Sequence, residues 1–183
     1  MVGKLKQLVY SDVSLLRQYA SGDTAAFDML YNRHKDALFN FLFRSLPNYA
    51  IVEEIAQETW LVVIQQAAAY KPEAAFRTWL FTVARNRLID HQRRRVNNAP
   101  NADDEVVEAI RSQDLSAEDQ TLLRQLLSAL DKLPNDQREA FILQQEGFSN
   151  RQIAQITGVG GETVKSRLRY AKTATRARMG VTT

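Results

Sequence analysis

Apolar side chains recur three and four residues apart along most of the 183-residue chain. This spacing places them on one face of an α-helix, whereas a half-buried β-strand needs strict alternation. The sequence sustains such alternation nowhere, so we predict an all-α protein. The apolar stripes of the first half are Val13, Leu16 and Ala20; residues 27–46; residues 51–63; and residues 76–88.

The helical pattern stops between Val96 and Leu115, where the chain is polar and acidic. Residues 101–119 hold seven anions and one cation, a net charge of −6. A segment of this composition, with one of the four prolines, is typical of a flexible tether. We therefore predict two small helical domains joined by a flexible acidic linker. The predicted ranges are 1–96 for the first domain, 97–115 for the linker and 116–183 for the second domain.

Basic segments lie on both sides of the acidic stretch. Residues 71–95 carry seven cations and two anions, and residues 138–178 carry eight cations and three anions, so each has a net charge of +5. Two such surfaces indicate contact with a polyanion. The chain contains no cysteine, which excludes disulfides, thiolate zinc sites and a cysteine nucleophile. It shows neither a signal peptide nor an apolar run near the roughly 20 residues of a membrane helix.

The second domain ends in two short predicted helices with a tight turn between them. Ser149 and Gln152 have the spacing of a capping box at the start of the first helix. Gly158 is placed to end that helix at positive φ. On the next helix, Val164 and Leu168 lie one turn apart and are expected to face inward. This arrangement predicts a four-helix domain that contains a helix-turn-helix.

The opposite face of the last helix is rich in cations and polar side chains. A helix that enters the major groove of DNA needs such a face, because cations and hydroxyl groups can contact base edges and phosphates. A solvated basic helix on a helical hairpin is the structural alternative. The candidate DNA-binding residues are Thr163, Lys165, Ser166, Arg167, Arg169, Tyr170 and Lys172.

The motifs of the chain resemble those of one family. The segment from Leu133 to Ala171, LPNDQREAFILQQEGFSNRQIAQITGVGGETVKSRLRYA, resembles region 4 of bacterial RNA polymerase sigma factors of the extracytoplasmic-function (ECF) group. Earlier segments resemble region 2.1 (LRQYASGDTAAFDMLYNRH), region 2.2 (EEIAQETWLVVI) and regions 2.3 and 2.4 (FRTWLFTVARNRLIDHQRRR). The turn before the last helix departs from the family, because Glu162 introduces an anion near the expected phosphate backbone.

The resemblance implies a promoter-specificity subunit that works in the cytoplasm, performs no covalent chemistry and needs no cofactor. Its first domain would bind the β′ subunit of core RNA polymerase and open the −10 element of promoter DNA. Its second domain would read the −35 element and contact the flap of the β subunit. An anti-sigma factor that holds the chain inactive is common in the family and is a further expectation.

Aromatic residues alternate with cations around the start of the fourth stripe. Cations that track phosphates, together with rings on which bases stack, are suited to single-stranded DNA. The resemblance places the capture of a flipped base in the loop of residues 70–75. Part of the aromatic set should belong to the core, and Trp79 is our expected core member. The candidate −10 residues are Tyr70, Lys71, Phe76, Arg77, Arg85, Asn86 and Arg93.

Carboxylates cluster on the third predicted helix. Glu54 and Glu58 lie one turn apart and share a face with Gln57. Such a face suits an arginine-bearing partner, and the resemblance makes it the candidate surface for core polymerase. A solvated helix surface is one alternative. A metal site that adds Glu53 is a weaker one, because both histidines of the chain lie in other predicted elements.

A second function remains compatible with the residues alone. A stand-alone helix-turn-helix regulator with a helical sensor or dimerisation domain would bind its operator without polymerase, usually as a dimer. The sigma-factor interpretation instead predicts weak DNA binding by the isolated chain. The predicted linker would leave its two DNA-reading surfaces without a fixed spacing. Linking the two surfaces would then add little to the affinity of the chain for DNA.

Overall fold

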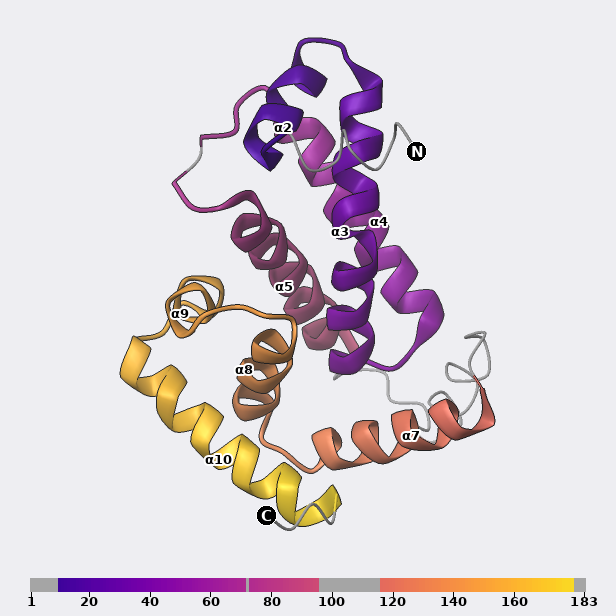
Figure 1. The fold of residues 1–183 in the computed structure, drawn as a ribbon, viewed down its shortest axis with the longest axis vertical. Helices are drawn as coiled ribbons and strands as arrows, with labels where there is room; N and C mark the ends of the chain where they lie inside the picture. The colour runs from indigo at the N-terminus through magenta and orange to yellow at the C-terminus, as the bar shows by residue number, and fades with distance from the viewer. Residues whose placement is uncertain (1–9, 72, 96–115, 180–183) are drawn as a thin grey trace.

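The computed structural model describes residues 10–71, 73–95 and 116–179. All regular elements in these ranges are helices, as the periodicity predicted (Figure 1). The predicted linker over 97–115 lies outside the described residues. No helix in the described part of the chain is long and apolar enough to cross a membrane. The helices are α2 (Asp12–Ala20), α3 (Thr24–Ser45), α4 (Tyr49–Gln66), α5 (Phe76–Arg95), α7 (Ala117–Asp131), α8 (Asn135–Gln145), α9 (Asn150–Thr157) and α10 (Gly161–Met179).

Local sequence signals set where the helices begin. Gly22, at φ 104°, separates α2 from α3, since this backbone conformation is costly for other residues. The Asp23 carboxylate then accepts a hydrogen bond from the Ala25 amide at 3.0 Å. The Ser116 hydroxyl caps α7 by accepting one from the Asp119 amide at 3.1 Å.

Helices α2 to α5 form the N-terminal domain, in which α5 packs against α3 and α4. The buried side of α5 carries Phe76, Leu80 and Ala84, which are spaced one turn apart and at most 1% exposed. The expectation that Trp79 would be a core residue is met in part, because its side chain packs against the buried cluster without being fully enclosed. Trp79 is half-buried, because it lies one position off this row and packs its ring 4.9 Å from the ring of Tyr70 at the domain's edge.

Helices α7 to α10 form the C-terminal domain. Its long last helix, α10, packs against α8, α9 and α7. The inward face of α10 consists of Val164, Leu168 and Ala171, with exposures of 0%, 4% and 0%. The predicted four-helix arrangement with a buried Val–Leu pair is therefore present.

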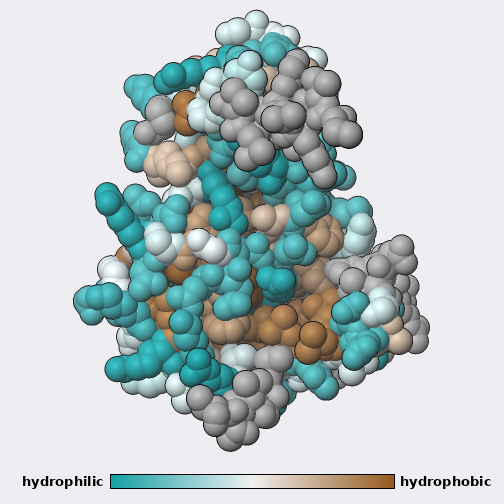
Figure 2. Space-filling model, in the orientation of Figure 1, coloured by the Kyte–Doolittle hydropathy of each residue, from teal (hydrophilic) through white to brown (hydrophobic). Residues whose placement is uncertain are grey.

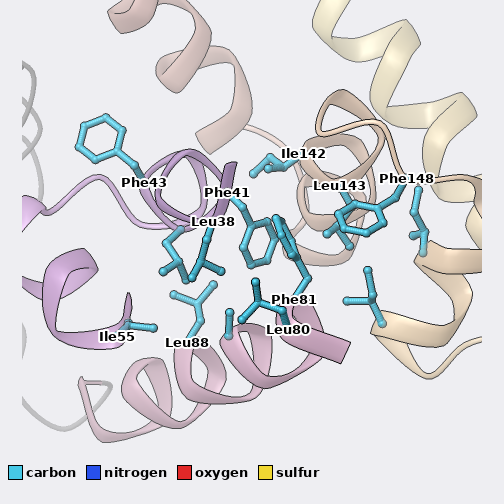
Figure 3. Close-up of a cluster of buried hydrophobic side chains, with 14 of the residues drawn as sticks. Leu38, Phe41, Phe43, Ile55, Leu80, Phe81, Leu88, Ile142, Leu143 and Phe148 are labelled. Carbon is cyan, nitrogen blue, oxygen red and sulfur yellow. The ribbon is translucent and has the colours of Figure 1, made fainter. Parts of the chain in front are cut away.

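The two domains pack against each other rather than standing apart. In Figure 1, α8 and α9 lie beside α5 and the lower end of α3. Figure 3 shows that Phe81 of α5 points toward Phe148 of the C-terminal domain, and their ring centroids are 4.7 Å apart. Buried residues of both domains form one continuous apolar cluster. The sequence prediction of two surfaces without fixed spacing therefore does not describe this structure, because apolar side chains around Phe148 cover α5.

The face of the molecule turned toward the viewer is mixed in polarity. Figure 2 shows hydrophilic side chains over most of this face, with an apolar area in its lower half.

Candidate nucleic-acid interface

The helix-turn-helix has the local geometry that the sequence predicted. The Ser149 amide donates to the Gln152 side-chain oxygen at 2.9 Å, and the Gln152 amide donates to the Ser149 hydroxyl at 3.4 Å. Together these bonds form the capping box of α9. Gly158 ends α9 in the left-handed region at φ 71°. Helix α10 begins at Gly161, three residues after this turn.

The outward face of α10 presents most of the predicted recognition residues. Thr163, Lys165, Arg169, Tyr170 and Lys172 are all exposed. The Arg169 guanidinium lies over the ring of Tyr170, 5.1 Å from its centroid. Because the opposite face is fixed in the core, these side chains project together into the surroundings. We call them, with Ser166, the α10 face.

Two predicted members of this site have carboxylate partners. Lys165 lies 2.6 Å from Glu162 in an exposed pair, which water weakens. The Lys165 ammonium therefore already has a carboxylate neighbour one turn earlier on α10. Arg167 is different, because its guanidinium lies 2.9 Å from the Asp136 carboxylate of α8. The Arg167 side chain is only 21% exposed. Ser166 is half-buried.

The predicted −10 residues fall into three groups: exposed polar residues, the two aromatic residues Tyr70 and Phe76, and two arginines that the C-terminal domain covers. Lys71, Asn86 and Arg93 are exposed. Tyr70 is half-buried, and its hydroxyl donates to the Ala74 carbonyl at 3.2 Å, which braces the loop. Burial, followed by the charge of Asp12, raises the pKa of the Tyr70 hydroxyl.

Phe76 does not fit its predicted role as a base-stacking residue. Its side chain is 1% exposed, and its ring packs against buried His34 at a centroid distance of 5.4 Å. The reason is position, since Phe76 is the first residue of the buried row of α5. Its ring also lies 6.2 Å from the ring of Tyr70, so Phe76 packs against the loop from the core side.

Arg77 and Arg85 form the third group, which the C-terminal domain covers. Arg85 donates from Nε and Nη2 to the two carboxylate oxygens of Glu139, at 2.6 and 3.2 Å. Arg77 donates to the Glu146 carbonyl at 2.5 Å. Its guanidinium also lies 4.4 Å from the ring centroid of Phe148. Burial lowers the pKa of Arg77, while the charge of Glu146 opposes the change.

The Glu146 carboxylate occupies a confined position between the domains. It accepts from Arg44 of α3 at 2.8 Å, and its side chain is 9% exposed. Burial raises the pKa of Glu146, against the opposing charges of Arg44 and Arg77. Sequence reasoning missed Arg44, Glu139, Glu146 and Phe148. No local signal could reveal them, since their partners lie 54 to 102 positions away.

The predicted polymerase-binding carboxylates are accessible on α4. Glu54 and Gln57 are exposed, while Glu58 is half-buried with Arg87 of α5 3.8 Å away. Two apolar residues outside the predicted set, Leu61 and Ile64, continue the same side of the helix and are 53% and 39% exposed. We call these five residues the α4 face. Among the described residues, no group of three or more His, Cys, Asp or Glu side chains is placed to hold a metal ion.

A helical domain joined to a helix-turn-helix domain with a cationic recognition helix defines a class of DNA-binding proteins. Comparison with known families narrows this class. The family model of sigma-70 region 2 matches residues 30–98, and that of sigma-70 region 4 matches residues 123–174.

Two curated relatives cover most of the chain. RNA polymerase sigma factor CarQ of Myxococcus xanthus is 34% identical over 163 residues, which are 86% of this chain and 92% of CarQ. ECF RNA polymerase sigma factor SigL of Mycobacterium tuberculosis is 34% identical over 86% of this chain and 90% of SigL. The chain therefore belongs to the ECF sigma factors, which bind core RNA polymerase and direct promoter recognition and transcription initiation.

Two solved structures share the fold. CnrH, in complex with the cytosolic domain of CnrY, matches with a TM-score of 0.72 and 25% identity over 94% of this chain and 99% of that chain. Sigma factor RpoE of Bartonella quintana, in complex with the anti-sigma factor NepR, matches with a TM-score of 0.70 and 23% identity over 86% of this chain and 98% of that chain. The similarity to RpoE supports the all-helical fold of this chain.

Proposed function

We propose that the α10 face reads the −35 element of the promoter. The observation that carries this proposal is the division of α10 into two faces. Val164 and Leu168 are buried, while Lys165, Arg169 and Lys172 project outward. Arginine and lysine donate to guanine edges and to phosphates, so this face has the chemistry of major-groove readout. Arg167, held by Asp136, would contribute less.

The N-terminal domain would open the −10 element. Its loop of residues 70–75 carries half-buried Tyr70 and exposed Lys71. Arg77, Arg85, Asn86 and Arg93 lie along α5, and the C-terminal domain contacts the first two of them. Cations of this helix would follow the phosphates of the displaced strand, while the loop would hold an unstacked base. We assign this role to the domain over residues 1–96, and −35 recognition to the domain over 116–183, with residues 97–115 as linker.

The α4 face would dock on the β′ subunit of core polymerase, and the C-terminal domain on the β flap. The α4 face combines the carboxylates of Glu54 and Glu58 with exposed Leu61 and Ile64. Protein interfaces commonly join a charged rim to an apolar centre. The chain would act in the cytoplasm without cofactor or covalent chemistry.

An anti-sigma factor is a further proposed partner. Sigma factor RpoE of Bartonella quintana forms a complex with one, NepR. RpoE is similar to this chain in fold, which supports testing the same kind of partner here. Co-purification of this chain from its own host, with identification of stoichiometric partners, would show whether such a protein exists.

Run-off transcription tests the central proposal. Core polymerase with this chain should transcribe a subset of a promoter library in which the −35 and −10 elements are randomised. Core polymerase alone should not select these templates. The chain alone should bind the selected promoters weakly. Tight and specific binding by a dimer of the isolated chain would instead identify a stand-alone regulator.

A further inference from the structure

A polar pair inside the N-terminal domain ties α2 to α3. His34 of α3 is 5% exposed, and its Nε2 atom lies 2.9 Å from Oδ2 of Asp12, the first residue of α2. An ionised carboxylate only accepts hydrogen bonds, so the imidazole Nε2 is the donor. The other carboxylate oxygen accepts from Arg33, which also donates to the Tyr10 carbonyl at 3.0 Å. Both oxygens of Asp12 are therefore engaged, and the imidazole ring has a fixed direction.

A row of rings leads from His34 to the loop of residues 70–75. The centroid of the Phe76 ring lies 5.4 Å from that of His34 and 6.2 Å from that of Tyr70, which it meets edge-on. The Tyr70 hydroxyl donates to the Ala74 carbonyl within the loop, at 3.2 Å. Because Phe76 is 1% exposed, it cannot move without displacing its neighbours in a close-packed interior. The imidazole therefore constrains the positions of Phe76, Tyr70 and the loop.

The charge of Asp12 also reaches two of the predicted −10 residues. Burial, followed by this charge, raises the pKa of Tyr70. Burial lowers the pKa of Arg77, while the charges of Glu146 and Asp12 oppose the change. In Figure 1, α2 and the connection between α4 and α5 lie at the same end of the N-terminal domain, and α2 contacts α5. The pair therefore lies close to the loop in space, although α2 and the loop are distant in the sequence.

The chemistry of the pair suits a positioning role. Apolar contacts are non-directional, so they hold side chains together without fixing the angle of a ring. A hydrogen bond to an ionised acceptor is short and directional. A buried polar pair is often no more stabilising than apolar residues of the same volume. Its fixed direction is thus what distinguishes the Asp12–His34 pair from another core contact.

We propose that Asp12 and His34 are positioning residues for base capture at the −10 element. They hold Phe76, and through it Tyr70, in the arrangement with which the loop selects an unstacked base. Neither residue contacts the base, since His34 is buried and both Asp12 oxygens are engaged within the domain. The inference rests on the proposed role of the loop, and it adds determinants of −10 preference that lie outside the loop.

Trp79 provides a sensor of the loop in the chain without DNA or polymerase. Its ring centroid lies 4.9 Å from that of Tyr70. The chain contains two tryptophans, so the variant W60F leaves Trp79 as the only one. In this background, H34L should increase the quenching of Trp79 fluorescence by acrylamide, because loss of the bond to Asp12 leaves the rings beside Trp79 less constrained.

A matched control separates positioning from general destabilisation. V52A truncates a side chain that is 0% exposed near the start of α4, at the opposite end of this helix from the loop. It should lower the stability of the domain and leave the quenching of Trp79 unchanged. Both variants are compared at a temperature at which circular dichroism shows them to be folded.

The promoter readout uses holoenzyme reconstituted from core polymerase and the full chain. Permanganate reactivity gives the melting of the preferred −10 element and of elements with one changed base. H34L should reduce the ratio between the two by about five-fold, within the range of coupling between residues that act through shared contacts. V52A should keep the ratio. An equal loss in V52A would assign the effect to destabilisation and overturn the inference.

Two further variants separate the hydrogen bond from the volume of the side chain. H34Q retains an amide that can donate to Asp12 in place of Nε2, so its ratio should lie nearer to that of the unmodified chain. D12N keeps the shape of the acceptor and removes its charge, so it should shift the ratio in the direction of H34L. This variant keeps the test decisive if H34L does not fold. The double variant D12N/H34L should lose no more than H34L alone, because H34L already removes the bond that D12N weakens; additive losses would contradict the inference.

The two readouts also distinguish this inference from the proposed function of the loop. If folded H34L leaves Trp79 quenching unchanged, the pair does not position the loop, and the inference fails whatever the ratio. If substitution of Lys71, Glu73 and Ala74 by Gly or Ser changes −10 preference while H34L does not, the loop function stands and only the inference fails. If neither change alters −10 preference, the proposed loop function is wrong, and the inference fails with it.

Discussion

Arg77 of the N-terminal domain lies against the ring of Phe148 in the C-terminal domain, 4.4 Å from its centroid. The ring of Phe148 also packs against the ring of Phe81, at a centroid distance of 4.7 Å. One aromatic side chain of the C-terminal domain therefore contacts both a cation and a buried apolar residue of the N-terminal domain. Phe148 is 3% exposed. The stability of the two domains should therefore be coupled through this residue.

Replacement of Phe148 by Ala should uncouple the domains. Loss of a buried phenyl ring costs about 3–5 kcal/mol in the free energy of unfolding. Urea unfolding followed by circular dichroism should change from one transition to two. The control L168A removes a side chain buried within the C-terminal domain and should destabilise that domain while the interdomain contact persists. A single transition in F148A would contradict the coupling.

Arg169 and Arg167 should differ in their contribution to −35 recognition. R169A should weaken holoenzyme binding to the preferred −35 element by about 1–3 kcal/mol if the contact is bidentate. R167A should cost less, because Asp136 already holds this guanidinium. Competition binding against promoters with single changes in the −35 element measures both effects. Equal weakening by R169A on every sequence would show that Arg169 contacts phosphate only.

Charge reversal on the α4 face should abolish polymerase binding. E54K/E58K removes two carboxylates and opposes any arginine-bearing partner. The nearby Arg87 makes only a long, half-exposed contact with Glu58, so the fold should survive. Pull-down of core polymerase, with circular dichroism for helicity, checks both expectations. The matched control D28K/D36K changes two exposed carboxylates of α3 and makes the same change in net charge. Normal transcription by E54K/E58K would contradict the assignment.

Rebuilding the loop should change −10 preference. Substitution of Lys71, Glu73 and Ala74 by Gly or Ser leaves the α4 face intact, so polymerase binding should persist. Promoter melting should weaken or shift in sequence preference, because the loop is the proposed site of base capture. Permanganate reactivity of the opened region provides the measurement. Unchanged melting and preference would remove the loop from the mechanism.

The stability of the N-terminal domain should depend on Asp12 at neutral pH. Burial alone would raise the Asp12 pKa, but the His34 and Arg33 interactions outweigh it, and the pKa lies below its ordinary value of 3.8. A lowered pKa means that the carboxylate stabilises the fold above pH 3.8, and that this contribution is lost as pH falls through the folded-state pKa.

The variant D12N should therefore lower the free energy of unfolding at pH 7 by about 1.5–3 kcal/mol. The difference from the unmodified chain should shrink below pH 3.8. Urea titrations across this pH range measure it. A difference that stays constant with pH would show that shape, rather than charge, accounts for the effect.

The helices, their caps and the division of α10 into two faces could all be predicted from the sequence. These features depend on residues a few positions apart. Ser149 and Gln152 form their capping box, and Gly158 reaches positive φ, through local geometry alone. The spacing of Val164 and Leu168 likewise fixes which face of α10 is buried.

The accessibility of the predicted site residues, in contrast, depends on tertiary packing. Phe76, a predicted DNA contact, is buried, while Trp79, the expected core residue, is only half-buried, since a small difference in position on α5 separates the buried row from its neighbours. Arg85 meets Glu139 because two domains fit together over a broad surface, and no sequence spacing encodes that fit. Interactions between distant segments depend on the shape and charge of whole surfaces, which exist only after the helices have packed.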